Sequence, residues 1–269
     1  MKKSVRDAFV GFTVPLEGLI RFFYADVKHL ITIGIGNLVD PISTALTLPL
    51  VRPDGTDASR DEIAAEWLKV KEACCKLKDG THEKWCVAWL GWQSTERITS
   101  LRLTPAGVDQ VVLGRLDLND ALLLRRFPDF EDWPADAQLA THSMAWACGP
   151  AFNFPRLATA LRGLDFATAA AECHMDERNN HGLVPRNIAN KRMYRNAARA
   201  MAWHLDPEEL HWPAELEDSV PTERELPVAD PVDEPVQEPD GGESRWRATS
   251  EAVVDAVRDL VTRRSGEDG

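Results

Sequence analysis

A strongly acidic, proline-rich stretch limits the part of this chain that can build a packed core. Residues 206–243 contain fourteen Asp and Glu residues against one Arg, and seven of the seventeen prolines of the chain. The stretch carries a net charge of −13 and has no apolar period, so it repels itself and has little apolar surface to bury. We therefore predict a folded domain over residues 1–204 and a disordered linker over residues 205–247.

The rest of the chain is close to electrically neutral. The whole sequence carries −12, so the residues outside 206–243 carry +1, and this balance gives no reason to expect a nucleic-acid partner. No apolar run approaches the roughly 18 residues that a membrane span needs. The charged start of the chain is signal-like, but Arg6 and Asp7 interrupt the apolar run and no small-residue cleavage site follows. We expect a protein that is made in the cytoplasm without a signal peptide.

Two carboxyl groups near the N-terminus have different surroundings. Glu17 lies in the apolar stretch 14–20, and partial desolvation raises the pKa of a carboxyl so that it stays protonated near neutral pH. Asp26 has polar neighbours, and we expect it to remain ionised. Two carboxyl groups whose surroundings separate their pKa values are typical of an acid and a base that act as a pair.

A short glycine-containing run follows these two residues. Residues 32–36 read Thr-Ile-Gly-Ile-Gly, which predicts a short strand and a turn that bring the hydroxyl of Thr32 close to the carboxylates. We expect this hydroxyl to orient a water molecule. A spacing of nine residues between Glu and Asp also arises by chance, and Gly-x-Gly is also an ordinary tight turn. The spacing alone therefore does not establish catalysis.

Taken together, these residues resemble a known active-site segment. Residues 17–38 fit the pattern E-G-L-x4-Y-x-D-x5-T-I-G-I-G-x-L, which is similar to the active-site segment of the T4-type lysozymes, the glycoside hydrolase family of phage endolysins. The resemblance implies that Glu17 is the general acid and that Asp26 holds or activates the attacking water. It implies that Thr32 helps to place that water.

The same resemblance implies a fold and a reaction. We expect a lysozyme-like α+β fold, mainly helical, with a small β-containing N-terminal lobe and a helical large lobe. The implied reaction is the hydrolysis, with inversion, of the β-1,4 bond between N-acetylmuramic acid and N-acetylglucosamine in bacterial peptidoglycan. Two alternatives stay open: a catalytically inactive cell-wall-binding or virion structural protein with this fold, and a lytic transglycosylase, which needs the Glu but no water-holding Asp.

The segment departs from the family pattern at two places. The family usually has His after the second glycine, where this chain has Asn37, and Leu38 completes the matched pattern. We interpret Asn37 as a changed structural support and take both residues as supporting or substrate-binding candidates. Pro15 precedes Glu17 where the family has an uninterrupted helix end. We expect it to kink or restart the helix, with Thr13 as an N-cap.

Start and stop patterns predict the helices of the folded part. Residues 57–78 form an amphipathic pattern that begins with Ser59 and Glu62 spaced as in a capping box, and the family has its long interdomain helix after a comparable start. Residues 134–149 predict a central buried helix that ends at Gly149. Further helices are expected at residues 154–162, 166–174 and 188–204.

Arg186 is a further candidate site residue. In the family a Gly-Leu-x-x-Arg-Arg element introduces the last helix, and its arginine reaches toward the catalytic Glu. Residues 182–186 read Gly-Leu-Val-Pro-Arg, but Asn187 stands in place of the second arginine. An arginine at a helix start is also commonly a solvated residue without such a role.

The resemblance is thin between residues 80 and 130. Trp85, Trp89 and Trp92 follow a helical spacing, which fits a sugar-stacking platform but is more typical of a core face. Thr104 and Pro105 predict the start of another helix. We expect residues 80–130 to form an extra helical insertion on the lysozyme-like core.

We expect neither a metal nor a cofactor. Cys74, Cys75, His82 and Cys86 lie close together in the sequence but lack a C-x2-C knuckle, so we interpret these cysteines as buried free thiols and not as a zinc site. The cysteine and histidines of residues 173–181 are equally unconvincing as metal ligands.

The C-terminal end carries a short amphipathic pattern. Residues 248–265 predict a helix with one apolar stripe and arginines in its last turn. Because a helix of this length is marginal alone, docking on a virion or secretion component is a hypothesis for it, while the acidic stretch before it is most simply a solvated spacer. We expect action on the cell wall, reached by host lysis, on a phage particle or by secretion.

Overall fold

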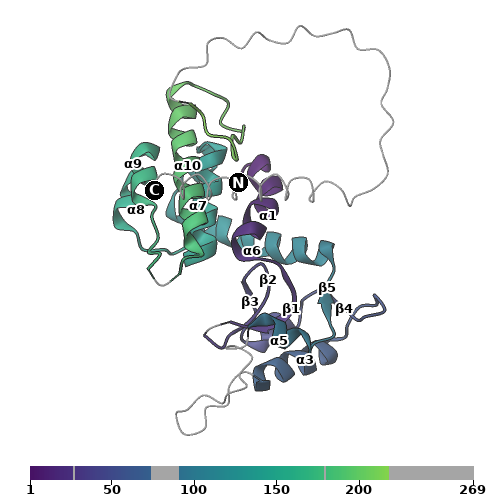
Figure 1. The fold of residues 1–269 in the computed structure, drawn as a ribbon. Coiled ribbons are helices and arrows are strands. Elements are labelled where there is room, and N and C mark those ends of the chain that lie inside the picture. The colour runs from purple at the N-terminus through teal and green to yellow at the C-terminus, as the bar shows by residue number, and fades with distance from the viewer. Residues whose placement is uncertain (27, 74–90, 179, 218–269) are drawn as a thin grey trace, which may run out of the picture. The chain divides into compact units, whose positions relative to one another are not determined.

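The structure, a computed structural model, describes residues 1–26, 28–73, 91–178 and 180–217 (Figure 1). The fold is α+β and mainly helical, with two small antiparallel sheets, and the mainly helical α+β class is as the sequence predicts. The chain divides into a sheet unit, Leu16–Ala121, and a helical unit, Met1–Pro15 with Leu122–Gly269. The N-terminal residues therefore belong to the helical unit, and the sheet unit follows them in the chain.

The sheet unit contains two small antiparallel sheets. The first has the strand order β1-β2-β3, and the second pairs β4 with β5. Its elements are β1 (Ile20–Ala25), β2 (Ile31–Gly34), β3 (Asn37–Leu38), α2 (Ile42–Ala45), β4 (Leu50–Val51), α3 (Arg60–Ala73), α5 (Trp92–Glu96), β5 (Arg102–Leu103) and the first part of α6 (Pro105–Arg126).

Aromatic and β-branched residues explain the strands of the first sheet and form its core. Phe23 of β1 and Ile31 and Ile33 of β2 are fully buried. Helix α3 packs against β1 and β2, and the indole Nε1 of Trp67 donates a 2.8 Å hydrogen bond to the carbonyl of Val39. The polar end of this buried aromatic side chain thereby finds a partner.

The predicted capping box begins helix α3. The backbone N–H of Glu62 donates to Ser59 Oγ at 3.3 Å, and the backbone N–H of Ser59 donates to Glu62 Oε2 at 2.8 Å. The helix lies wholly within the sheet unit, whereas α6 has residues in both units. The comparison of residues 57–78 with an interdomain helix is therefore wrong, and α6 is the helix that runs from one unit into the other.

The region predicted as an insertion is part of the sheet unit over residues 91–121. Strand β5 pairs with β4, and the first part of α6 buries Val108, Val112 and Leu116. The expected start of α6 is confirmed, because Thr104 Oγ1 accepts a 3.0 Å hydrogen bond from the backbone N–H of Gly107. Helical spacing could not reveal that the short strand before α6 completes a sheet.

The helical unit is built around helix α7. This helix is buried from Ala135 to Trp146, as predicted, and it contacts α10, which in turn contacts α9. The elements of the unit are α1 (Lys3–Glu17, which continues into the sheet unit), the 3-10 helix η1 (Phe130–Asp132), α7 (Ala135–Cys148), α8 (Pro155–Arg162), α9 (Phe166–Glu172) and α10 (Leu183–Ala202).

Two prolines lie inside helices where the sequence predicted breaks or later starts. Helix α1 continues through Pro15 to Glu17, so the predicted restart is wrong; Thr13 is buried inside it, and its hydroxyl finds no hydrogen-bond partner among the described residues. Helix α10 begins at Leu183, five residues before the predicted start. Pro185 is compatible with the first helical turn because no backbone donor is required there.

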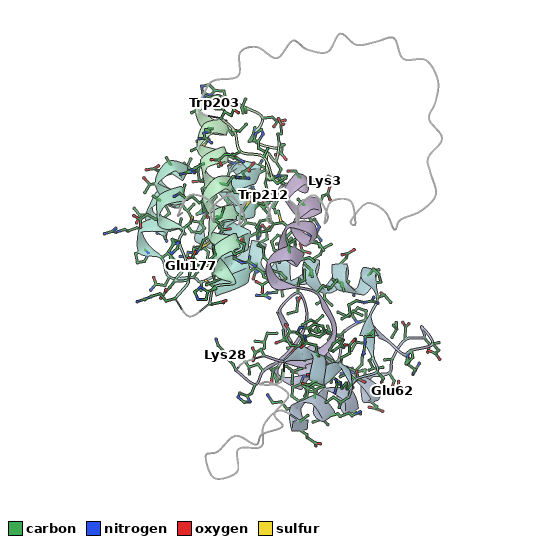
Figure 2. The ribbon with its side chains drawn as sticks, viewed as in Figure 1. Lys3, Lys28, Glu62, Glu177, Trp203 and Trp212 are labelled. Atoms are coloured by element: carbon green, nitrogen blue, oxygen red, sulfur yellow. The ribbon has the colours of Figure 1, made fainter. Side chains whose placement is uncertain are left out.

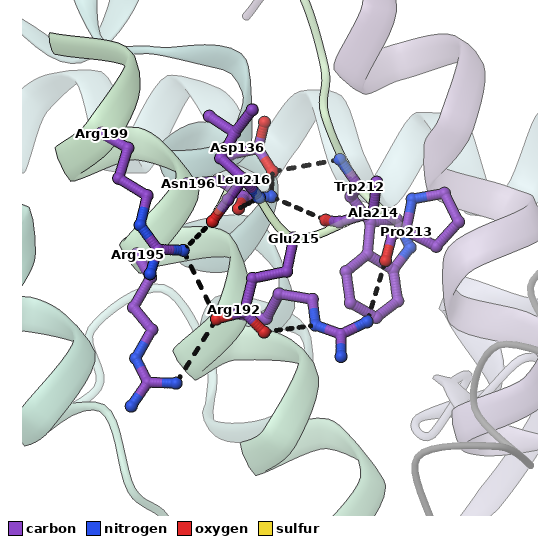
Figure 3. A network of polar contacts seen from close by, with 10 residues as sticks. All are labelled: Asp136, Arg192, Arg195, Asn196, Arg199, Trp212, Pro213, Ala214, Glu215 and Leu216. Carbon is purple, nitrogen blue, oxygen red and sulfur yellow. Dashed lines mark hydrogen bonds and ion pairs between the residues drawn. The ribbon is translucent and has the colours of Figure 1, made fainter. Parts of the chain in front are cut away.

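Residues 205–217, predicted as the start of a disordered linker, pack against α7 and α10 (Figure 3). Trp212, labelled in Figure 2, is buried, and the buried carboxylate of Asp136 accepts hydrogen bonds from the backbone N–H groups of His211 and Trp212. The acidic composition of the stretch did not indicate these contacts. Because of them, the folded part extends at least to residue 217. The predicted linker from 218 and the C-terminal helix at 248–265 lie outside the described residues.

Candidate functional site

All three residues predicted to act on a sugar lie in the sheet unit. Glu17 is the last residue of α1, Asp26 follows directly on β1, and Thr32 lies in β2. The β1-β2 hairpin therefore carries two of them, and the end of the preceding helix carries the third.

Tyr24 connects the three residues. It lies directly opposite Thr32 in the antiparallel ladder of β1 and β2. The pKa of the Tyr24 phenol is raised to about 12, first by burial and then by the negative charges of Glu17 and Asp26, which disfavour a phenolate. Both carboxylates are thus near enough to act on one side chain, and the structure brings the three predicted residues together around it.

A row of side chains crosses the sheet at this position. Tyr24 pairs with Thr32, and Thr32 pairs with Leu38 of β3. Residues directly opposite each other in an antiparallel ladder share one face of the sheet. Thr32 is only 5% exposed, whereas Leu38 is 53% exposed. The row thus ends in an exposed apolar side chain at the edge strand.

The backbone after β1 fixes one oxygen of Asp26. Its Oδ1 accepts hydrogen bonds from the backbone N–H groups of Lys28 at 2.8 Å and Leu30 at 2.9 Å, within a turn in which His29 has a φ of 63° (Figure 2 labels Lys28). Within the part of the chain that the structure describes, no donor bonds Oδ2 of Asp26. The carboxylate is therefore held by one oxygen while the other can accept from a water or a ligand.

The hydroxyl of Thr32 is held weakly. Its Oγ1 donates to the carbonyl of Leu30 over 3.4 Å, which is long for an O–H···O hydrogen bond. The hydroxyl can therefore donate to a better placed acceptor, such as a bound water, instead of to Leu30 at little energetic cost.

Gly36 lies against the carboxylate of Glu17. Its φ is +73°, and a Cβ at this position would lie 3.4 Å from Glu17 Oε2. The turn after β2 thus needs glycine for its left-handed backbone, and the missing side chain permits the close approach of the Glu17 carboxylate.

The exposure of the Glu17 side chain differs from the prediction. The prediction placed it in an apolar setting that removes water from the carboxyl, but the structure exposes its side chain. The reason is its position at the end of α1, directly before Gly18, whose φ of +75° turns the chain away from the helical path. Apolar neighbours in the sequence therefore do not become a covering layer in space.

Asn37, the departure from the family pattern, joins β3 to α6. It is buried, and its Nδ2 lies 3.4 Å from the carbonyl of Val111, to which it donates. Its Oδ1 has no hydrogen-bond partner among the described residues. Its contact with a helix carbonyl is compatible with the structural support predicted for it.

Arg186 belongs to the helical unit, in the first turn of α10. It is 1% exposed, and its Nη1 donates to the carbonyl and to the hydroxyl of Ser143. Asn187, which replaces the second arginine of the family pattern, holds the backbone of Met175 by two hydrogen bonds. The proximity of Arg186 to Glu17 stays a prediction.

Arg115, which the sequence analysis did not identify as a site residue, contacts the turn after β2. Arg115 of α6 donates a 2.8 Å hydrogen bond from Nη1 to the carbonyl of Gly36. Its spacing from Val111 indicates a shared helix face, but no motif in the sequence indicates that Gly36 is its partner.

Trp92 is 41% exposed, so its assignment to a core face is wrong. Gly91, with a φ of +80°, precedes α5 and is incompatible with a helix continuing through it; Trp85 and Trp89 lie outside the described residues.

Searches against protein-family models, curated proteins and solved structures give no match to this chain.

Within the described ranges no group of three or more His, Cys, Asp or Glu side chains is arranged to hold a metal ion. No helix in those ranges is both long and apolar enough to cross a bilayer. The predicted thiol cluster, Cys74, Cys75, Cys86 and His82, lies outside those ranges. Cys173 is buried and Cys148 exposed, and both are free thiols.

Proposed function

We propose that this chain is a muramidase with a lysozyme-like fold, which hydrolyses the β-1,4 bond between N-acetylmuramic acid and N-acetylglucosamine of peptidoglycan with inversion. The observation that carries the proposal is the convergence of Glu17, Asp26 and Thr32 around Tyr24.

Glu17 acts as the general acid. Its proton passes to the glycosidic oxygen while the bond from that oxygen to C1 of the N-acetylmuramic acid breaks. The side chain is exposed in the free protein, and a sugar chain bound over it removes water from the carboxyl. Bound substrate thereby shields the acid from bulk water while the proton moves to the glycosidic oxygen.

Asp26 and Thr32 act on the water. Oδ2 of Asp26, which accepts from no donor among the described residues, accepts a proton from the water as the water attacks C1 from the opposite face of the sugar ring. The weakly held hydroxyl of Thr32 orients the same water. The products are a new reducing end on N-acetylmuramic acid and a free hydroxyl on N-acetylglucosamine.

The exposed side chain of Leu38 provides an apolar contact for the substrate. It stands next to Thr32 across the sheet, so a sugar ring placed over the row packs its apolar face there. No metal or cofactor takes part in this scheme.

The deciding experiment compares the full chain with Glu17→Gln on purified peptidoglycan and counts new reducing ends. Wild type releases them and Glu17→Gln does not, since an amide cannot donate the proton that the leaving group needs. Glu96→Gln, an equal change at an exposed position of α5, serves as the control and keeps activity.

The same experiment separates the alternatives. If wild type releases no reducing ends above the Glu17→Gln level, the muramidase proposal is wrong and the inactive cell-wall-binding or virion protein takes its place. Mass analysis that finds anhydro-muramic ends instead of reducing ends assigns the protein to the transglycosylases.

A further inference from the structure

The turn that touches Glu17 is attached to helix α6 at two points. Arg115 Nη1 donates to the carbonyl of Gly36 at 2.8 Å, and the carbonyl of Val111 accepts from Asn37 Nδ2 at 3.4 Å. Val111 and Arg115 are four residues apart, so they lie one above the other on a single face of the helix. One helix face therefore holds Gly36 of the turn and Asn37, the first residue of β3.

Helix α6 is a rigid base for this attachment. Three of its residues on the buried side, Val108, Val112 and Leu116, are at most 4% exposed, and the helix is capped by Thr104. A buried helix face moves little relative to its own core because the interior is close-packed. Whatever α6 holds is therefore held in a defined place.

The attachment is stronger at Arg115 than at Asn37. A charged guanidinium donor at 2.8 Å forms a charge-assisted hydrogen bond, whereas the amide bond of Asn37 is long at 3.4 Å. Gly36 accepts the stronger bond, and Gly36 is also the residue that lies against Glu17 Oε2.

We propose that Arg115 is a positioning residue for the general acid. It holds the carbonyl of Gly36 and thereby fixes the backbone against which the Glu17 carboxylate rests. The inference rests on the proposed function and adds to it a residue that the family resemblance does not contain. Proton donation requires the carboxyl within hydrogen-bond reach of the glycosidic oxygen, and a displacement of about 1 Å at a reacting group can cost roughly a hundredfold in rate.

Arg115→Met tests this role because it keeps the apolar stem and removes the donors. Its kcat on peptidoglycan falls at least roughly tenfold while KM stays within about threefold, since the acid and not the sugar-binding surface is displaced. Arg115→Lys recovers part of the lost kcat, because an ammonium is still a charged donor although it lacks the planar fork. Arg125→Met, at an exposed position of the same helix, keeps wild-type kcat.

Hydrogen exchange of the backbone amides of residues 34–38 supplies a readout that needs no activity. Arg115→Met increases exchange there, and exchange of the buried β1 amides stays at the wild-type level. If Arg115→Met does not fold, Gly36→Ala decides, because it keeps Arg115 while placing a Cβ at 3.4 Å from Glu17 Oε2 on a strained backbone, and it lowers kcat as well.

The outcomes distinguish this inference from the function on which it rests. An active wild type together with an Arg115→Met variant that keeps kcat within twofold overturns the role of Arg115 alone. The role is also overturned if Arg115→Met lowers both kcat and the free energy of unfolding and Arg115→Lys restores neither. Arg115 is then a purely structural residue. A wild type that releases no reducing ends overturns the muramidase proposal and this inference with it.

Discussion

Tyr24 and Thr32 lie directly opposite each other in the antiparallel ladder of β1 and β2, and the charges of Glu17 and Asp26 both act on the phenol of Tyr24. Tyr24 therefore links all three predicted site residues, and its titration depends on two of them, Glu17 and Asp26. Because the phenol has an optical titration of its own, the geometry of the site can be tested without any substrate.

The titration of Tyr24 provides the first prediction. The chain has two tyrosines, so Tyr194→Phe leaves Tyr24 as the single phenol. In that background we expect Tyr24 to titrate with a pKa of about 12, because burial and two nearby carboxylates disfavour the phenolate. Phenolate absorbance against pH measures it, with circular dichroism to confirm that the fold persists.

Removing either carboxylate tests the cause of this shift. Glu17→Gln and Asp26→Asn each move the pKa of Tyr24 toward its ordinary value of 10, and Glu17→Gln moves it further because the charge of Glu17 is the larger cause. Burial keeps the pKa above 10 in both variants. If neither variant changes the titration, the two carboxylates do not lie around Tyr24.

The same shift predicts how stability depends on alkaline pH. The folded-state pKa of Tyr24 is raised above its unfolded value, so between about pH 10 and 12 the unfolded chain releases the proton first. The contribution of Tyr24 is fully present below pH 10, and the free energy of unfolding decreases as the pH rises through this window. Urea unfolding of wild type and Tyr24→Phe at several pH values measures the difference, which is constant below pH 10 and changes above it.

Variants of the water-handling residues test the proposed mechanism. Asp26→Asn lowers kcat by about 10²- to 10⁴-fold with little change in KM, because the amide cannot accept the proton of the water. Thr32→Val causes a smaller loss, since it removes only an orienting hydroxyl. Asp61→Asn, at an exposed position of α3, keeps the wild-type rate. An Asp26→Asn variant with near-wild-type hydrolysis would remove Asp26 from the mechanism.

Local chemistry made parts of this fold predictable. Ser59 and Glu62 bond each other's backbone across one helical turn, so the start of α3 depends on residues three apart in the sequence. Gly149 follows α7 with a φ of +81°, which other residues rarely adopt, so the end of that helix is also a local property.

Contacts between distant residues were not predictable in the same way. Arg115 and Gly36 are 79 positions apart, and neither residue type indicates the other. The composition of residues 205–217 predicts a solvated chain, yet their backbone donors reach a carboxylate 75 and 76 positions earlier. At Glu17 the residue was identified by a family pattern, but its exposure depends on where α1 ends and could not be inferred from apolar neighbours.

Asp136 shows what such a distant contact contributes to stability. It is 1% exposed and accepts hydrogen bonds from Asn196 Nδ2 at 2.9 Å and from the backbone N–H of Trp212 at 3.2 Å (Figure 3). It also accepts a hydrogen bond from the backbone N–H of His211 at 2.8 Å. We expect Asp136→Ala to lower the free energy of unfolding by about 1–3 kcal/mol, because buried donors lose their acceptor. Urea unfolding measures the change, and Asp129→Asn, at an exposed position before η1, leaves it unaltered.

The pH dependence of the same carboxyl is the most specific test of its burial. Burial raises the pKa of Asp136 above the ordinary value of 3.8, against the opposing effect of its hydrogen-bond donors. The unfolded chain therefore releases this proton at lower pH than the folded chain, so the pH-dependent part of the contribution of Asp136 is complete below pH 3.8 and is lost as the pH rises through the folded-state pKa. Asp136→Asn cannot titrate, so the stability difference between wild type and this variant shifts against wild type over that window. A difference that does not change with pH would show that the folded and unfolded chains bind this proton equally, and that the donors from Asn196, His211 and Trp212 fully offset the burial.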